Sequence, residues 1–353
     1  MPPLPIDLVA EILCRLPIKL LLQLRCLSKS FNSLITDPKF AKKHLRLSTT
    51  LHHLILESRD NLGELHLIDS PISSFSNFRV TLTKLSHPFI LNTFSWRMCT
   101  CDGILCFTPS TSKDNFVVLW NPSIRKFKRV PPLGYQCRLF SNHYSFGYDP
   151  FIDNYKIIVV YFSRESEKNE ISVHTLGTEY WRRIQDFPFS GHIGGPGIFV
   201  KDTVNWLAFE NVDNNGLFAI VSLDLETESY EIISILDVNS DKYWSLEVLR
   251  DCLCIYVTSD LDLDVWIMKE YGVKESWTKL YSVSFVGGQM YDIRTLYIFE
   301  HDQILVELHD WERTQHLIVY DSKIDTFNIQ DIENGSLLKN PKVYIESLIS
   351  PSA

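Results

Sequence analysis

Two pairs of cysteines are the residues whose type and spacing first suggest chemistry in this sequence. One residue separates Cys99 from Cys101, and one separates Cys252 from Cys254. Thiolates at short spacing are zinc ligands, but residues i and i+2 of a strand do not close a four-ligand site, and no histidine follows at zinc-finger spacing. The eight cysteines lie mostly in apolar segments. We therefore expect reduced thiols in a core and no metal site.

An acidic triplet and a glycine-rich run are weaker signals. The triplet begins like a calcium-binding loop at Asp260, Asp262 and Asp264, but Val265 and Tyr271 stand where that loop requires Gly and Glu. The run GHIGGPG, residues 191–197, has glycines at the wrong offsets to hold a phosphate, so we interpret it as a turn or loop. The motifs G-x-S-x-G, H-E-x-x-H, G-x-x-x-x-G-K-S/T and G-x-G-x-x-G do not occur. We expect no catalytic residue and no cofactor.

The first 48 residues are unusually rich in leucine. Between Leu4 and Phe31, 17 of 28 residues are apolar, whereas a helix that covers one core needs about three in seven. Apolar residues recur at helical spacing, Pro17 ends a first helix, and Ser28 suits the cap of a third that stops near Pro38. Three short helices with more than one apolar face predict either a cap on the rest of the chain or a docking module for another protein.

Composition and charge separate this segment from the rest. Residues 1–48 hold eight Lys or Arg and three Asp or Glu, whereas the other 305 residues hold 26 and 40, so we expect the two parts to meet different partners. The acidic body argues against nonspecific nucleic-acid binding. No apolar run approaches the ~18 residues of a membrane helix, and the amino end does not resemble a signal peptide. The expected compartment is the cytoplasm or nucleus, with no membrane attachment.

A repeat of about 50 residues begins at residue 49, where short β-branched and aromatic runs alternate with turn residues. One layout recurs and ends in an aromatic residue at intervals of 52, 54, 49, 47 and 50, at Phe75, Phe127, Trp181, Tyr230, Trp277 and Phe327. Such a unit with about four strands is typical of a β-propeller blade. We predict a mainly β fold with about six blades, or seven if one is irregular. Pairing of the terminal KVYIESLI with the first β segment would close the ring. A solenoid or a large sandwich is the structural alternative.

Blocks of residues in both parts resemble one family. The amino segment contains LP, DL, EIL, RLP, RC, KS and DPKF, and the body contains CDGILCF, VLWNPSIRKFKRVP, FGYDPFIDNYKI, GIFVKDTVNWLA and the closing YIESLISP. Their order resembles that in plant F-box proteins with an F-box-associated, kelch-like domain, over almost the whole chain. There are departures: Phe31 stands where the family usually has Trp, and Asp202 and Asn205 replace a usual Gly and His.

The resemblance implies two domains. Residues 1–48 would form a small three-helix F-box, and residues 49–353 would form a kelch-like β-propeller that binds a target. The F-box would dock onto the Skp-type adaptor of an SCF ubiquitin ligase and, through it, meet cullin and RING subunits. The positions that match the family's contact motif are Leu4, Pro5, Leu8, Ile12, Leu16 and Pro17. For Val9, Leu13 and Leu24 we favour packing within the chain.

The expected function is that of a non-catalytic receptor. It would bring an unknown target protein close to a ubiquitin-charged enzyme held by other subunits. The alternatives are a propeller enzyme, a propeller that binds a glycan or another small molecule, and a scaffold, none of them part of a ligase. Five aromatic residues would be target anchors if exposed, although blade core is the favoured interpretation: Trp206, Tyr243, Trp244, Trp266 and Trp311.

Overall fold

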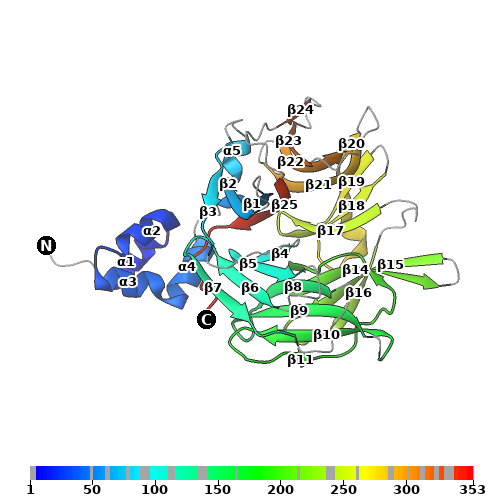
Figure 1. The fold of residues 1–353 in the computed structure, drawn as a ribbon, viewed down its shortest axis with the longest axis horizontal. Coiled ribbons are helices and arrows are strands. Elements are labelled where there is room, and N and C mark those ends of the chain that lie inside the picture. Colours follow the sequence, from blue (N-terminus) through cyan, green and yellow to red (C-terminus); the bar gives the residue numbers. More distant parts are fainter. Residues whose placement is uncertain are drawn as a thin grey trace.

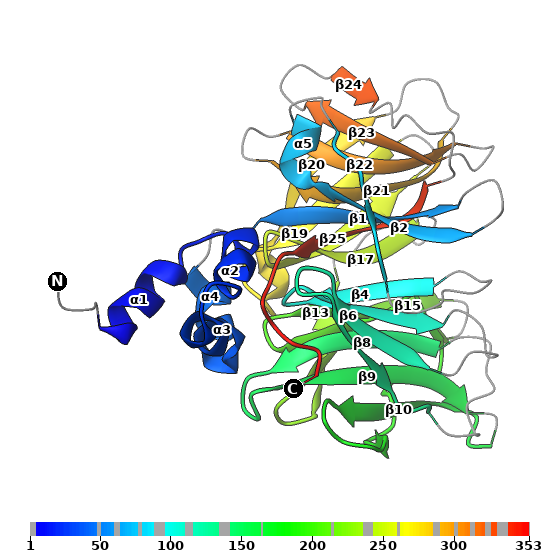
Figure 2. The same ribbon diagram turned by 60° about the vertical axis from the view of Figure 1, so that its left-hand side comes forward.

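Six antiparallel sheets form a ring in this computed structural model, and a group of helices lies against one face of the ring (Figures 1 and 2). The sheets are the blades of a β-propeller, so the predicted mainly β fold with six blades is confirmed. The structure describes residues 5–47, 51–59, 64–76, 80–87, 96–109, 116–133, 142–163, 165–212, 215–235, 243–259, 262–284, 290–299, 303–310, 315–321, 326–329 and 338–352.

Four helices form the helical module, residues 6–47: α1 (Ile6–Leu13), α2 (Ile18–Leu24), α3 (Lys29–Thr36) and α4 (Pro38–Leu47). The Ser28 hydroxyl caps α3, as predicted, by accepting a hydrogen bond from the Phe31 N–H at 3.1 Å. The fourth helix goes beyond the predicted three. Pro38 follows the end of α3 but is also the first residue of α4, where its missing N–H costs nothing, and Asp37 accepts the Lys39 N–H at 2.7 Å.

Five blades are built from strands that are consecutive in the sequence. Blade 2 has β4 (Trp96–Cys101), β5 (Ile104–Pro109), β6 (Val117–Asn121) and β7 (Lys126–Val130). Blade 3 has β8 (Asn142–Asp149), β9 (Asn154–Ser163), β10 (Lys168–Thr175) and β11 (Arg182–Arg183). Blade 4 has β12 (His192–Ile193), β13 (Ile198–Val200), β14 (Thr203–Val212), β15 (Asn215–Asp224) and β16 (Tyr230–Ser234).

Blades 5 and 6 follow the same plan. Blade 5 has β17 (Tyr243–Leu249), β18 (Cys252–Thr258), β19 (Asp262–Met268) and β20 (Trp277–Ser284), with the short 3-10 helix η1 (Lys274–Ser276) before β20. Blade 6 has β21 (Met290–Ile298), β22 (Gln303–Asp310), β23 (Gln315–Asp321) and β24 (Thr326–Ile329).

Blade 1 joins the two ends of the propeller. Its sheet order is β25-β1-β2-β3, formed by β25 (Leu338–Ile345), β1 (His52–Arg59), β2 (Leu65–Pro71) and β3 (Thr83–Leu85). Strand β25 pairs antiparallel with β1 and places Val343 opposite Leu54. The predicted closure by the terminal strand is therefore confirmed, and it pairs an edge that would otherwise be open to other chains.

The aromatic repeat corresponds to the last hairpin of each blade. Phe127 on β7 lies opposite Trp120, and Tyr230 on β16 lies opposite Leu223, so the interval of about 50 residues is the length of one blade. Blade 1 differs because Phe75 belongs to α5 (Ile72–Ser76), inserted between β2 and β3, where its side chain is buried.

The inner strands of the blades are β25, β4, β8, β12 with β13, β17 and β21, and all run in one direction. Each begins at the face of the ring away from the helical module, here called the far face, and ends at the near face (Figure 2). The module rests on the near face. Lys42 of α4 forms an ion pair with Asp153 in the turn after β8, and its ammonium lies 5.4 Å from the centre of the Tyr148 ring.

The carboxyl segment, residues 346–352, holds the module and the blades together. Leu348 and Ile349 belong to the same buried apolar cluster as Leu21 of the module and Ile104 of blade 2. The Asn121 amide donates to the carbonyls of Ser347 at 3.0 Å and Ile349 at 2.8 Å. Residues of three sequence blocks quoted above are therefore in contact: CDGILCF, VLWNPSIRKFKRVP and YIESLISP.

Candidate functional site

The helical module presents an exposed apolar surface, here called the docking face. It consists of Ile6, Leu8, Ile12, Leu20 and Leu27, whose exposed fractions lie between 45% and 71%. Five large apolar side chains within 22 consecutive residues are far more than scattered surface exposure would give. This excess of exposed apolar side chains on one small module favours a protein-binding site.

Helix α1 has two apolar faces because its apolar residues form two rows at helical spacing. Leu8 and Ile12 form the outward row. Leu13 is buried, and Val9 and Leu24 pack against the same cluster, so the expectation of internal packing for these three is confirmed. The inward row packs in the apolar cluster, and the outward row is exposed.

The structure places the six positions from the contact motif differently. Pro5, Leu8, Ile12 and Pro17 are exposed, and Leu4 lies outside the described residues. Leu16 is half-buried against the core that the module shares with the propeller, and its carbonyl accepts a hydrogen bond from His44 Nε2 at 2.9 Å. The motif did not include Ile6, Leu20 and Leu27, for which the surplus of apolar residues was the available signal.

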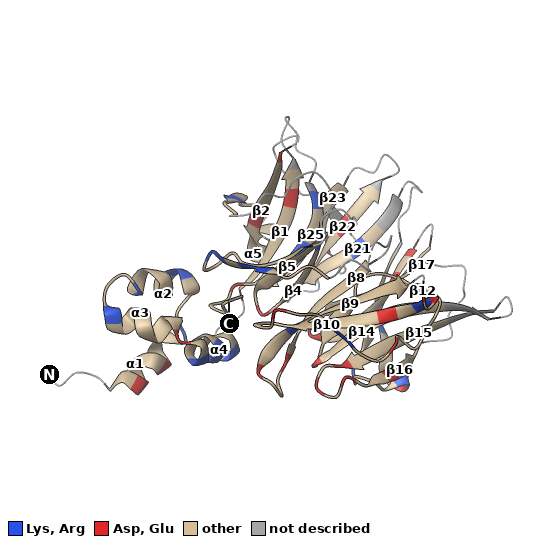
Figure 3. Cartoon of the chain, turned by 60° about the horizontal axis from the view of Figure 1, so that its bottom comes forward, with Lys and Arg blue, Asp and Glu red and all other residues tan. Residues whose placement is uncertain are grey.

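Positive charge lies on three of the four helices of the module, whereas α1 carries Asp7 and Glu11. Figure 3 shows Lys and Arg on α2, α3 and α4. Arg15, Lys19 and Lys29 are exposed and form no ion pair with any described residue. Unpaired positive charges on the same module as exposed apolar side chains favour an acidic partner, because the charges steer its approach and the apolar side chains supply the affinity.

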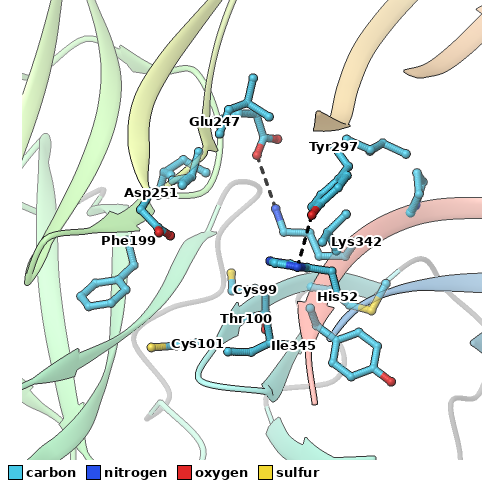
Figure 4. Close-up of a pocket in the computed structure, with 18 of the residues that line it drawn as sticks. His52, Cys99, Thr100, Cys101, Phe199, Glu247, Asp251, Tyr297, Lys342 and Ile345 are labelled. Carbon is cyan, nitrogen blue, oxygen red and sulfur yellow. Dashed lines mark hydrogen bonds and ion pairs between the residues drawn. The ribbon is translucent and has the colours of Figure 1, made fainter. Parts of the chain in front are cut away.

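The second candidate site is the central channel of the propeller, which contains two cavities. The near cavity, of about 380 Å³, opens toward the helical module and the far cavity, of about 440 Å³, opens on the far face. Both are lined by Glu247, Arg294 and Lys342, which lie between them. Figure 4 shows the near cavity, with Lys342 pointing at Glu247 and the Tyr297 hydroxyl pointing at His52.

The three charged residues between the cavities form one ionic group from three blades. Arg294 of β21 pairs with Glu247 of β17, and Lys342 of β25 lies 3.5 Å from the other Glu247 oxygen. Burial raises the pKa of Glu247, but the positive charges of Arg294 and Lys342 outweigh it and leave that pKa below its ordinary value. The carboxylate stays ionised and links the inner strands of blades 1, 5 and 6.

The cysteines of the channel wall are poor ligands and poor nucleophiles. Burial raises the pKa of Cys99 to about 11, and it raises the pKa of Cys101 well above the ordinary value. The thiols therefore stay protonated at neutral pH. Within the part of the chain that the structure describes, no group of three or more His, Cys, Asp or Glu side chains is arranged to hold a metal ion. Asp264 of the acidic triplet pairs with Lys279 at 2.9 Å, and Asp260 lies outside the described residues.

The aromatic residues considered as anchors divide into two groups. Trp206 and Trp244 are buried in blade cores, and Trp266 is half-buried with the Lys279 ammonium 5.3 Å from its ring. Tyr243 is 83% exposed at the far-face end of β17. It is the one described member of the set in a position to anchor a target. Trp311 lies outside the described residues.

The two departures from the family pattern in blade 4 are both accommodated. Asp202 has a left-handed backbone with φ of 65°, a conformation that suits the usual Gly. Asn205 is fully buried, and its side-chain oxygen accepts a hydrogen bond from the Tyr271 hydroxyl at 2.7 Å. This bond joins blade 4 to blade 5, so Asn205 has a structural role.

Comparison with known proteins matches both parts of the chain. The family model "F-box domain" matches residues 2–43, and the model "F-box associated beta propeller domain" matches residues 65–351. The F-box protein CPR1 of Arabidopsis thaliana is 29% identical over 93% of this chain and 85% of its own length. An F-box/kelch-repeat protein of the same plant is 27% identical over 99% of this chain and 96% of its own.

Among solved structures, the hydrazine synthase of Kuenenia stuttgartiensis matches with a TM-score of 0.50 at 9% identity, over 90% of this chain and 49% of that one, a likeness of fold alone. No helix in the described ranges is long and apolar enough to cross a membrane.

The match over residues 65–351 covers most of the sequence and agrees with the six blades of the ring. The chain therefore belongs to the family of F-box proteins that carry an F-box-associated β-propeller domain.

Proposed function

We propose that this protein is the non-catalytic substrate receptor of an SCF-type ubiquitin ligase. Residues 1–48 would bind a Skp-type adaptor, which connects to cullin and RING subunits, and residues 49–353 would bind the target protein. The observation that carries the proposal is the docking face: α1 buries its inward row in the apolar cluster and leaves an outward row, including Leu8 and Ile12, exposed.

The arrangement of the two faces supports this division of labour. The module occupies the near face, so a target held at the far face would not compete with the adaptor for space. Tyr243, exposed at the far face, is suited to anchor a target because tyrosine offers a large contact area with little loss of rotamer entropy. The contribution of this chain to ubiquitin transfer would be proximity and orientation, in the cytoplasm or nucleus.

Co-expression with a Skp-type adaptor, followed by size-exclusion chromatography, tests the proposal. We expect a one-to-one complex with the unchanged chain. Ile12→Ser should weaken adaptor binding at least tenfold. An isoleucine that becomes buried in the complex contributes about 2 kcal/mol to the free energy of binding, and serine would lose this contribution. Ile232→Ser is the matched control, since Ile232 is similarly exposed but lies on β16 of the propeller. Folded protein that forms no complex, or equal binding by both variants, would contradict the proposal.

A further inference from the structure

The far cavity of the channel has features that the receptor function does not explain. Its walls come from the inner strands of several blades and include Arg97, His143, His192, Gly195, Arg294 and Lys342. A volume of about 440 Å³ lies in the range of small-molecule sites. It is also on the face of the propeller opposite the helical module, away from the docking face.

The glycine-rich run GHIGGPG forms one wall of this cavity. It interrupts the inner strand of blade 4: Gly194 N–H donates to the Leu207 carbonyl at 2.8 Å, and pairing resumes at Ile198 opposite Asn205. Residues 195–197 therefore lie opposite the single residue Trp206 and form a bulge. A side chain at Gly195 would meet no atom within 4 Å, so this part of the backbone borders open space.

The cavity has an excess of positive charge. Its lining contains Arg97, Arg294 and Lys342 and one acidic residue, Glu247, which pairs with the last two. Behind Arg294, a Glu307 oxygen lies 3.9 Å from the guanidinium. Arg97 is exposed and forms no ion pair with a described residue. It supplies the free charge of the site.

Two buried nitrogen atoms in the lining have no hydrogen-bond partner among the described residues. They are Nδ1 of His143, a residue with 7% of its surface exposed, and Nε of Arg294. Buried polar atoms usually have a partner, and these two nitrogens are covered by protein atoms, so the accessible charge of the wall comes from Arg97. Burial and the charge of Arg97 lower the pKa of His143 to about 4. The imidazole is therefore neutral at pH 7 and offers a hydrogen bond and no charge.

Apolar side chains complete the lining. Trp96 and Ile193 are almost fully buried and, with Pro196 and Pro341, border the same space. A ligand suited to these walls combines an acidic group with a compact apolar body.

We propose that the far cavity is a binding site for a ligand that carries a carboxylate group. Arg97 would contact its acidic group, and Trp96, Ile193 and Pro196 would contact its body. The acidic group has two possible sources, a free carboxylate or an acidic segment of a protein. The proposal does not depend on adaptor binding.

Ligand-observed NMR on the full chain at constant ionic strength tests the site with benzoate, and with benzamide as its neutral counterpart. We expect saturable binding of benzoate, at least tenfold tighter than that of benzamide. Arg97→Gln should weaken benzoate binding at least fivefold. Lys126→Gln is the matched control, because it removes one exposed positive charge from β7 of the same blade and should leave binding unchanged.

A peptide of six glutamates distinguishes the two sources. Binding of benzoate that depends on Arg97 supports a free anion, and binding of the peptide alone, with the same dependence, supports an acidic protein segment. The proposal is overturned if neither probe binds to folded protein, or if Arg97→Gln and Lys126→Gln behave alike. Adaptor binding by Arg97→Gln should equal that of the unchanged chain, so failure of this site would leave the receptor proposal intact.

Discussion

The first helices and the carboxyl segment are both apolar and both lie at the near face of the propeller, but they use their apolar residues in opposite ways. Leu348 and Ile349 are 6% and 5% exposed, whereas Leu8 and Ile12 are 52% and 55% exposed. The carboxyl segment also has specific hydrogen bonds, from Asn121 to its carbonyls. Apolar composition alone does not distinguish a segment that is buried in the core of its own chain from one whose apolar residues are exposed and available to bind another protein.

The backbone contacts of the two regions explain the difference. Gly103 allows close approach of the carboxyl segment, because a side chain there would lie 2.5 Å from the Ser347 Oγ. The outward row of α1 has no such complementary surface among the described residues of the chain. Complementary packing with directed hydrogen bonds marks the segment that belongs to the core.

The largest expected effect comes from equal truncations in the two regions. Leu348→Ala should lower the free energy of unfolding by about 3 kcal/mol, because it leaves a cavity in a buried cluster. Leu8→Ala should change it by less than about 0.5 kcal/mol, because Leu8 is half exposed. Urea unfolding followed by tryptophan fluorescence measures both. Equal losses of stability would remove the distinction between the two regions.

A smaller effect is expected at Asn121. Asn121→Ala should cost about 2 kcal/mol of stability, because two buried carbonyls of the carboxyl segment lose their donor. Asn32→Ala, at an exposed position of α3, serves as the control and should stay within about 0.5 kcal/mol. A melting temperature for Asn121→Ala equal to that of the control would show that apolar packing alone holds the segment.

The smallest effect concerns pH and the start of the carboxyl segment. His53 Nδ1 lies 3.0 Å from Asp69, Nε2 lies 3.8 Å from Glu346, and the Tyr344 hydroxyl donates to Asp69 at 2.9 Å. Burial lowers the pKa of His53, but its bond to Asp69 and the nearby negative charges outweigh burial and raise that pKa above 6.5. Protonated His53 therefore stabilises the folded state. This contribution is fully present below pH 6.5 and is lost as pH rises through the pKa of His53 in the folded state.

The difference in stability between the unchanged chain and His53→Gln should therefore shrink as pH rises above 6.5. Urea midpoints across pH 6 to 9 measure this difference. His316→Gln on β23 is the control, because His316 belongs to blade 6, whereas His53, Asp69 and Tyr344 belong to blade 1. A difference that does not vary with pH would exclude His53 as a charged contact of the carboxyl segment.

The number of blades and their closure were predictable from the sequence because each blade repeats one hairpin. Phe127, Tyr230 and Trp277 lie on the outermost strands of blades 2, 4 and 5, at intervals of about two blade lengths and one blade length. The exception is Phe75. It has the expected spacing, but it lies in the helix α5 and not on a strand. The spacing of the aromatic residues predicts the number of repeats, but it does not predict whether each aromatic residue lies on a strand or in a helix.

The site was less predictable because it depends on contacts between distant segments. Leu16 continues the row of Leu8 and Ile12 in sequence, yet His44 of α4 and the shared core draw it inward. Asp37 and Pro38 can mark either the end of α3 or the start of α4, because Pro is common both after a helix and at its first position. The sequence alone therefore did not predict α4. The far cavity brings Arg97, His143 and Lys342 together from three blades, a convergence that no local pattern records.

The position of the inner strand of blade 1 in the sequence determines when the ring can close during synthesis. Strand β25 is synthesised after every other strand, so the ring stays open while the helical module has already left the ribosome. A product that stopped before residue 338 would retain the docking face and lack a closed propeller. Under the proposed function, such a product would occupy the adaptor without delivering a target, and the cell would have reason to degrade incomplete chains quickly.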